Sequence, residues 1–120
     1  MGIGTDIIEV ARIEKSIASE RFLKEVYTEK EIELIKKKGA ETAAVNFAAK
    51  EAFSKALGTG VRGFRLSEVE ILRDSLGKPY INLYGAAARI AGNTEIEVSL
   101  SHTKEYAVSF VIIKGEKKDA

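Results

Sequence analysis

One stretch near the middle of the chain, residues 46–60, constrains the fold more than any other, because it predicts a long helix with a defined end. Its sequence, NFAAKEAFSKALGTG, is rich in alanine and lysine, which favour helices, and Gly58 is a suitable C-terminal stop. At about 100° per residue, the apolar side chains gather on one face of such a helix. That face holds Val45, Ala49, Ala52, Phe53, Ala56 and Leu57.

The opposite face of this helix carries a mixture that a purely solvated face would not usually carry. It holds Phe47, Glu51, Ser54, Lys55 and Gly58, so we expect it to meet something other than water. Glu51 and Lys55 stand one turn apart. Taken alone, a glutamate four residues before a lysine is also typical of an ordinary surface ion pair, which stabilises a helix by about 0.2–0.5 kcal/mol.

Length and composition predict a single globular domain of 120 residues, of which 45% are hydrophobic and 31% charged. The net charge of +1 gives no reason to expect a nucleic-acid partner. The chain has no cysteine, which excludes disulfides, thiolate metal sites and cysteine nucleophiles. The longest apolar run, residues 107–113, is too short to span a bilayer, and no signal-peptide pattern is visible. We therefore expect a cytoplasmic protein without membrane contact.

Local patterns outside the central helix predict five strands and three further helices around it. A capping box begins a helix at Thr28, and three lysines before Gly39 mark its end. A β-hairpin is predicted around a turn at residues 74–78. The complete set is a strand at 2–10, helices at 11–17 and from 28, hairpin strands at 68–73 and 79–84, a helix at 85–92, strands at 95–102 and 106–114, and a mobile tail at 115–120.

Two sites near the N-terminus, Asp6 and a group of two arginines with a phenylalanine, each allow two interpretations. Asp6 lies inside the first predicted strand, where it either points to water from an edge or is buried and seeks a cation. Arg12, Arg21 and Phe22 either belong to an ordinary solvated helix or form a docking face for an acidic partner helix.

Two polar stretches later in the chain are also ambiguous. The glycine-rich loop at residues 58–63 could place backbone N–H groups against phosphate oxygens. It matches neither the P-loop nor the dinucleotide fingerprint, so a flexible helix stop is an equal alternative. The segment Ser101-His102-Thr103, at the end of a strand, contains the only histidine, and a lone histidine is more often structural than catalytic.

The carboxylates of Asp6 and Glu51, with Lys55 one turn after Glu51, are suited to binding a metal ion and a phosphate. Two oxygen ligands without cysteine or paired histidine favour Mg²⁺, which completes its shell with substrate phosphates and water. A lysine beside such a site would serve a phosphate or a leaving group. Taken alone, the residues lead no further than metal-assisted phosphate chemistry.

Four blocks of the sequence resemble the signature blocks of the holo-(acyl-carrier-protein) synthases, the short-chain 4′-phosphopantetheinyl transferase family. The blocks occur in the family's order and span almost the whole chain. They are GIGTDIIEVARI at residues 2–13, FAAKEAFSKALGTG at 47–60, GKP at 77–79 and LSHTKEYA at 100–107.

The resemblance implies the reaction and its catalytic residues. Coenzyme A would donate its 4′-phosphopantetheine arm to a serine of an apo acyl carrier protein and release adenosine 3′,5′-bisphosphate, in support of fatty acid biosynthesis. By motif position, Asp6 and Glu51 would hold Mg²⁺ at the pyrophosphate of the coenzyme. Glu51, or a metal-bound water that it orients, would take the serine proton, and Lys55 would stabilise or protonate the leaving phosphate.

The resemblance also implies substrate-binding residues, a fold and an assembly. Coenzyme A would contact Lys55, Gly58, Lys78, His102 and Thr103, and the carrier would dock on Arg12, Arg21 and Phe22. The fold would be α+β, a single domain over residues 1–120 with an antiparallel sheet packed against the long central helix. The assembly would be a homotrimer with active sites between subunits, in which a neighbouring protomer could cover Phe47.

One departure from the family keeps other interpretations open. The family commonly has arginine before the phenylalanine of the central block, where this chain has Asn46, so a phosphate contact at this position stays open. A binding protein that holds coenzyme A or a carrier without transfer is one alternative, although intact Asp6, Glu51 and Lys55 argue against it. A structural oligomer that binds no coenzyme A is the other.

Overall fold

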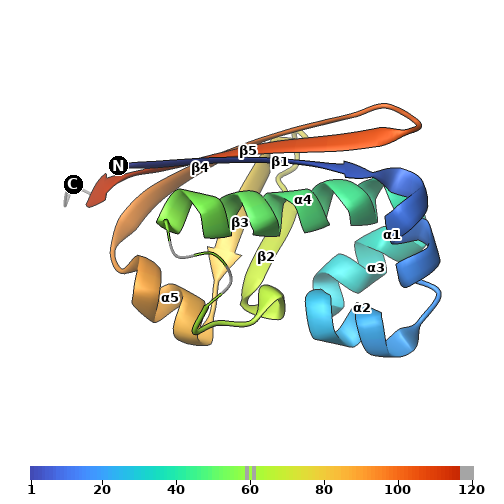
Figure 1. Cartoon of the computed structure of the whole chain (residues 1–120), viewed down its shortest axis with the longest axis horizontal. Helices are drawn as coiled ribbons and strands as arrows, with labels where there is room; N and C mark the ends of the chain where they lie inside the picture. Colours follow the sequence, from blue (N-terminus) through green and yellow to red (C-terminus); the bar gives the residue numbers. More distant parts are fainter. Residues whose placement is uncertain (59, 61, 117–120) are drawn as a thin grey trace.

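The computed structural model describes residues 1–58, 60 and 62–116, and one long helix runs through its centre (Figure 1). This helix, α4 (Ala40–Leu57), begins after Gly39, six residues earlier than the stretch that predicted it. It ends where the sequence predicts, because Gly58 adopts the left-handed conformation (φ +79°) and its N–H donates to the carbonyl of Lys55.

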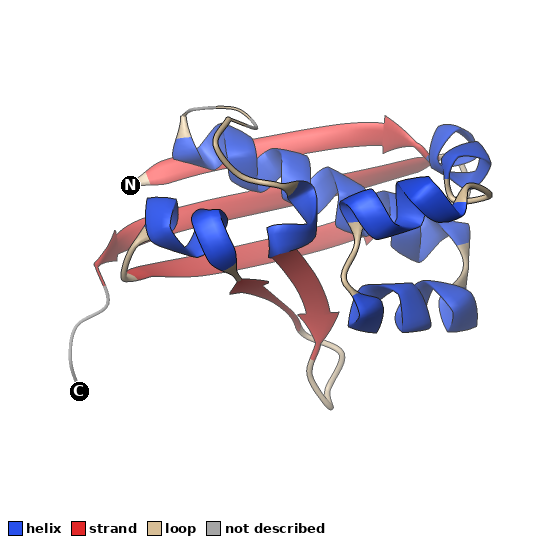
Figure 2. Cartoon of the chain, turned by 90° about the horizontal axis from the view of Figure 1, so that it is seen from below, coloured by secondary structure: helices blue, strands red, loops and turns tan. Residues whose placement is uncertain are grey.

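A three-stranded antiparallel sheet lies along α4, with its strands in the order β1-β5-β4 (Figure 2). Two glycines let β1 lie directly on the helix: a Cβ added at Gly2 would come within 1.9 Å of the Ala56 carbonyl oxygen, and one at Gly4 within 1.9 Å of that of Ala52. The strands are β1 (Gly2–Glu9), β4 (Thr94–His102) and β5 (Tyr106–Glu116).

The predicted β-hairpin forms a second, two-stranded sheet on the other side of α4 (Figure 1). Its turn is fixed by Asp74, whose Oδ1 accepts hydrogen bonds from the N–H groups of Leu76 and Lys78, each at 2.9 Å. Pro79 begins the returning strand, where a missing N–H does little harm. The hairpin strands are β2 (Val69–Arg73) and β3 (Pro79–Leu83).

Shorter helices cover the two ends of α4. The sequence did not predict α2, although Ser19 caps it by accepting a hydrogen bond from the N–H of Phe22. β5 continues to Glu116, so the prediction of a tail from residue 115 was wrong there, and residues 117–120 lie outside the described chain. The helices are α1 (Val10–Ser16), α2 (Glu20–Val26), α3 (Glu29–Lys38), the 3-10 turn η1 (Leu66–Glu68) and α5 (Gly85–Ala91).

The core has two parts, because α4 is buried on nearly all sides. The predicted apolar face is buried except for Leu57, which is partly buried, and Asn46, Lys50 and Ser54 on other faces are buried too. Phe47 is partly buried against Phe22 of the same chain, with stacked ring centroids 6.2 Å apart. Phe22 of the same chain therefore covers part of Phe47, because α2 folds back onto it.

A buried ion pair, which the sequence did not predict, joins α3 to α4. The Nζ of Lys50 lies 2.7 Å from Oε1 of Glu31, and both side chains are fully buried. Lys50 also donates to the carbonyls of Leu66 and Val69, so it holds the start of the hairpin against the helix. The predicted capping box at Thr28 is confirmed, and its Glu31 carboxylate serves both the cap and this ion pair.

Candidate active site

The strand β1 places Asp6 beside one end of α4. Side chains alternate along a strand, so Asp6 lies on the same face as Gly4, which faces the helix. The Nζ of Lys55 donates to Oδ1 of Asp6 at 3.2 Å and to the carbonyl of Thr5 at 3.0 Å. Asp6 therefore faces a cation and the helix. β1 is an edge strand, as one of the two alternatives required, but Asp6 does not point to water from that edge.

Glu51 lies close enough to Asp6 for the two carboxylates to repel each other. Burial raises the pKa of Glu51 above its usual value, the charge of Asp6 raises it further, and Lys55 and Arg12 oppose the increase. In the part of the chain that the structure describes, the carboxylate paired with Lys55 is that of Asp6. The interpretation of Glu51 and Lys55 as an ordinary surface pair was therefore wrong.

This arrangement can hold a divalent cation. Two repelling carboxylates are stabilised when a cation binds between them, and Asp6 and Glu51 are the residues that could do so. Among the described residues, no group of three or more His, Cys, Asp or Glu side chains gathers in one place. The remaining ligands would therefore come from phosphate and water, as is usual for Mg²⁺.

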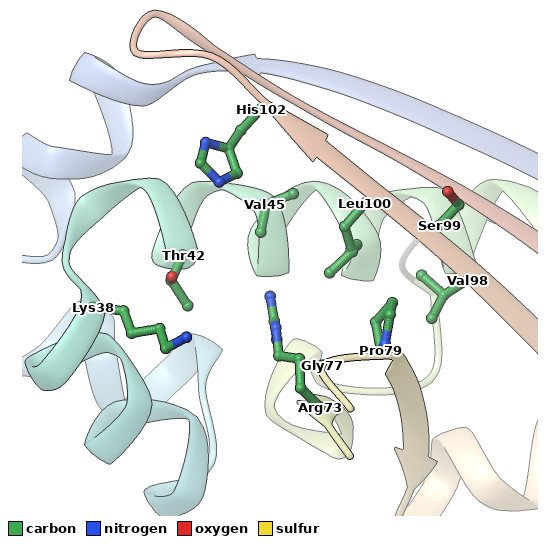
Figure 3. Close-up of a pocket in the computed structure, with 10 residues that line it drawn as sticks. All are labelled: Lys38, Thr42, Val45, Arg73, Gly77, Pro79, Val98, Ser99, Leu100 and His102. Carbon is green, nitrogen blue, oxygen red and sulfur yellow. The ribbon is translucent and has the colours of Figure 1, made fainter. Parts of the chain in front are cut away.

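A cleft of about 370 Å³ opens on the opposite side of α4, between that helix, β4 and the hairpin (Figure 3). His102 lies at its rim, and its Nδ1 is 2.9 Å from Oε2 of Glu41. The walls combine cationic with apolar side chains. The lining residues are Lys38, Thr42, Val45, Arg73, Gly77, Pro79, Val98, Ser99, Leu100 and His102.

The residues predicted to contact coenzyme A do not all line this cleft. His102 lines it, and Lys78 lies between two lining residues, 3.8 Å from Oε2 of Glu97. Thr103 lies in the turn after β4, where its Oγ1 accepts from the N–H groups of Glu105 and Tyr106. Gly58 ends α4, and Thr59 and Val61 of the glycine-rich loop lie outside the described residues.

The sequence missed four polar residues of the cleft, Lys38, Thr42, Arg73 and Ser99. Lys38 is the last residue of a helix and Arg73 the last residue of a strand, where cations are common, so neither gave a signal for binding. Asn46 does not line the cleft: it is fully buried, and its Nδ2 donates to Oε2 of Glu31 at 2.9 Å and to the carbonyl of Ile71 at 3.0 Å.

The predicted docking residues lie on or near α1 and α2. Arg12 and Arg21 are exposed, and Phe22 is partly buried on Phe47. Arg21 pairs with Glu25 at 2.9 Å, whereas the charge of Arg12 reaches Glu51. A partner bound at Arg12 would therefore lie close to the carboxylate site.

Two parts of the predicted site do not come together within one chain. Asp6 is on β1 and His102 is on β4, which are the two outer strands of the sheet with β5 between them. Asp6 and Leu100 of the cleft both pair with Ser109, from opposite sides. The carboxylates and the cleft consequently lie at opposite edges of the sheet.

A model of the 4′-phosphopantetheinyl transferase superfamily matches residues 2–111. The chain belongs to this superfamily. A holo-[acyl-carrier-protein] synthase of Fusobacterium nucleatum subsp. nucleatum is 50% identical over 119 residues, which cover 94% of this chain and 98% of that protein. One from Clostridium botulinum (strain Alaska E43 / Type E3) is 49% identical over 118 residues, covering 94% and 96%.

Solved structures of phosphopantetheinyl transferases confirm the predicted fold. The holo-(acyl-carrier-protein) synthase of Bacillus anthracis, in complex with CoA (3′,5′-ADP), matches with a TM-score of 0.81 and 37% identity over 93% of this chain and 94% of that one. The Helicobacter pylori synthase in complex with coenzyme A matches with a TM-score of 0.82 and 32% identity, over 93% and 99%. The predicted α+β class and the predicted enzyme class, holo-(acyl-carrier-protein) synthase, are both confirmed.

Within the described residues, no helix has the length and apolar content needed to cross a membrane.

Proposed function

We propose that this chain transfers the 4′-phosphopantetheine group of coenzyme A to a serine of an apo acyl carrier protein, with Mg²⁺, and that this reaction supports fatty acid biosynthesis. The observation that carries the proposal is the meeting of Asp6, Glu51 and Lys55 where β1 lies along α4. The named relatives support the reaction class, and two related structures hold coenzyme A. We propose the cytoplasm, where both substrates would be available, as its location.

The chemistry follows from the two carboxylates and the lysine. The serine Oγ attacks the phosphorus that bears the pantetheine arm, a new P–O bond forms, and the pyrophosphate P–O bond breaks to release adenosine 3′,5′-bisphosphate. Glu51, directly or through a water that it orients, receives the serine proton. Lys55 donates to the leaving phosphate, and Asp6 holds Lys55 in position before substrate arrives. Bound at Asp6 and Glu51, Mg²⁺ would neutralise phosphate charge.

We propose that the active site is completed by a second copy of the chain within a homotrimer. The carboxylates lie at the β1 edge of the sheet and the cleft lies at the β4 edge. Each copy would therefore present its carboxylates to one neighbour and its cleft to the other. A contact between two different edges repeats head to tail and can close into a ring. The outward face of β1 and β5 is apolar and exposed, with Ile3 58%, Ile7 64% and Phe110 41% exposed, which suits burial by another subunit.

One incubation tests the reaction. The purified chain, coenzyme A, Mg²⁺ and an apo carrier should give a carrier that is heavier by one phosphopantetheine in mass spectrometry. Asp6→Asn and Glu51→Gln should remove this product, while Lys36→Gln, at an exposed lysine of α3 away from both halves of the site, should retain it. Near-normal transfer by both carboxylate variants would refute their role. Binding of coenzyme A without transfer by the unaltered chain would identify a binding protein instead.

A second measurement tests the assembly. Ile7→Arg on the exposed face of β1 should convert a trimer to monomer in light scattering and should lower transfer in the same preparation. A monomeric unaltered chain with full activity would contradict the shared site.

A further inference from the structure

The first turn of α3 holds the hairpin against α4 through buried side chains. Glu31, which is fully buried, accepts hydrogen bonds from two α4 residues one turn apart, Lys50 at 2.7 Å through Oε1 and Asn46 at 2.9 Å through Oε2. The same two amino groups also donate to backbone carbonyls in β2 and the turn before it. These carbonyls are those of Leu66 and Val69, which Lys50 reaches, and Ile71, which Asn46 reaches. One carboxylate of α3 therefore orients both α4 side chains that bind this segment.

A second link from the same turn of α3 reaches both strands of the hairpin. The Oγ1 of Thr28 donates to Oε2 of Glu70 at 2.6 Å, and Oε1 of Glu70 accepts from Asn82 and Tyr84. Glu70 is buried on β2, and Asn82 is its partner on β3. The N–H of Thr28 also donates to Oε1 of Glu31 at 3.1 Å, so both links start from one helix turn.

The link matters for the cleft because α4 and the hairpin form two of its walls (Figure 3). Val45 of α4 lines the cleft one residue before Asn46, and Arg73 of β2 lines it two residues after Ile71. The bond from Asn46 to the carbonyl of Ile71, at 3.0 Å, therefore joins the two walls. Apolar side chains of α4 and β2 also pack together, but such contacts are non-directional, whereas a hydrogen bond fixes the position of the strand along the helix.

We propose that Glu31 is a positioning residue for coenzyme A. It does not contact the coenzyme, but through Lys50 and Asn46 it sets the position of the hairpin on α4 and thereby the affinity of the cleft between them. This inference rests on the proposed function, because it takes coenzyme A as the occupant of the cleft.

Glu31→Gln would break the link selectively. Its amide oxygen can still accept from Lys50, but its amide nitrogen would face Nδ2 of Asn46, and two donors cannot pair. Asn46 could turn its Oδ1, which has no hydrogen-bond partner in the described part of the chain, toward this nitrogen only by giving up its bond to Ile71. The hairpin would then occupy other positions. If the competent position falls to about a tenth of the population, the apparent Kd rises about ten-fold.

Transfer kinetics, with each substrate varied in turn, test the inference. Glu31→Gln should raise KM for coenzyme A about ten-fold and keep both kcat and KM for the carrier, because the carboxylate site is untouched. Calorimetry of coenzyme A binding should show the same ten-fold loss. Asn46→Ala keeps the ion pair of Glu31 with Lys50 but removes the bond to Ile71, so it should also raise KM for coenzyme A. It provides the test if Glu31→Gln does not fold.

A matched control and a second readout separate positioning from general stability. Ile35→Val loosens the packing of a buried residue one turn after Glu31, without touching these bonds, and should keep KM for coenzyme A. Hydrogen exchange of the free chain, followed by mass spectrometry, should become faster in Glu31→Gln at residues 69–83 and stay unchanged in β1 and β5.

The outcomes also separate the inference from the proposed function. A lower kcat with unchanged KM in Glu31→Gln overturns the inference, because it indicates only a smaller folded fraction. An equal rise of KM in Ile35→Val, or faster exchange throughout the chain, overturns it as a general loosening. Transfer by the unaltered chain with KM unaffected in Glu31→Gln and Asn46→Ala overturns the inference alone. Failure of the unaltered chain to bind coenzyme A overturns the inference and the proposed function together.

Discussion

The buried ion pair between Glu31 and Lys50 gives a prediction whose size follows from the structure. Lys50→Met would leave the Glu31 carboxylate in the core with the N–H of Thr28 and the amide of Asn46 but without its cation. It would also leave the carbonyls of Leu66 and Val69 without this donor. Removing one partner of a buried pair costs about 3–5 kcal/mol, a large part of the roughly 5–15 kcal/mol by which a domain is stable.

A double-mutant cycle measures this cost by urea denaturation followed by circular dichroism. Lys50→Met should lose about 3–5 kcal/mol of unfolding free energy, and Glu31→Gln should lose less, because its amide oxygen can still accept from Lys50. The double variant should be more stable than the sum of the two losses predicts, since neither charge is then left alone. Lys36→Gln, an exposed lysine of the same helix α3, should change stability by less than about 0.5 kcal/mol.

The pH dependence of the Lys50→Met variant provides an independent check. Burial already raises the pKa of Glu31 above its usual value, and loss of the Lys50 charge would raise it further. An acid whose pKa is raised in the folded state destabilises the fold at pH values above its unfolded pKa, and this penalty disappears as the pH falls to that value. The loss caused by Lys50→Met should therefore be smaller near pH 5 than at pH 7. A loss below about 1 kcal/mol, or strict additivity in the cycle, would refute the reasoning.

Three further predictions address the carboxylate site, the strand beside it and the docking face. Asp6→Asn should lower the pKa of Glu51, measured by NMR titration without metal, because the charge of Asp6 helps to raise it; an unchanged value would mean that the two carboxylates do not interact. Gly4→Ala should destabilise the fold by about 1–3 kcal/mol or more in thermal unfolding, because its Cβ would meet the carbonyl oxygen of Ala52 at 1.9 Å, and an unchanged melting temperature would contradict the close packing of β1 on α4. Arg12→Glu should weaken binding of an acidic carrier in calorimetry and spare coenzyme A, whereas equal loss of both would count against a separate docking face.

Local signals in the sequence were sufficient for most of the secondary structure. The end of α4 at Gly58, the capping box at Thr28 and the hairpin turn at Asp74 depend on residues within a few positions of each other. Each was predicted because the chemistry of a cap or turn is local. The missed helix α2 also had a local signal, because Ser19 caps its first turn.

Burial and pairing of charges could not be predicted in the same way. Lys50 is fully buried because Glu31 and two carbonyls reach it from other elements, and nothing in its own helix indicates this. Arg73 lines the cleft only because the hairpin folds against α4. The candidate residues Asp6, Glu51 and Lys55 were identified from motifs, but their pairing, Asp6 with Lys55 across 49 positions, required the fold.

The most direct test of the central claim is anomalous diffraction from crystals grown with coenzyme A and Mn²⁺ in place of Mg²⁺. We predict one Mn²⁺ peak in contact with a carboxylate oxygen of Asp6 and one of Glu51, with pyrophosphate oxygens completing its shell. A peak that contacts neither carboxylate, or coenzyme A bound with its pyrophosphate away from Asp6 and Glu51, would contradict it.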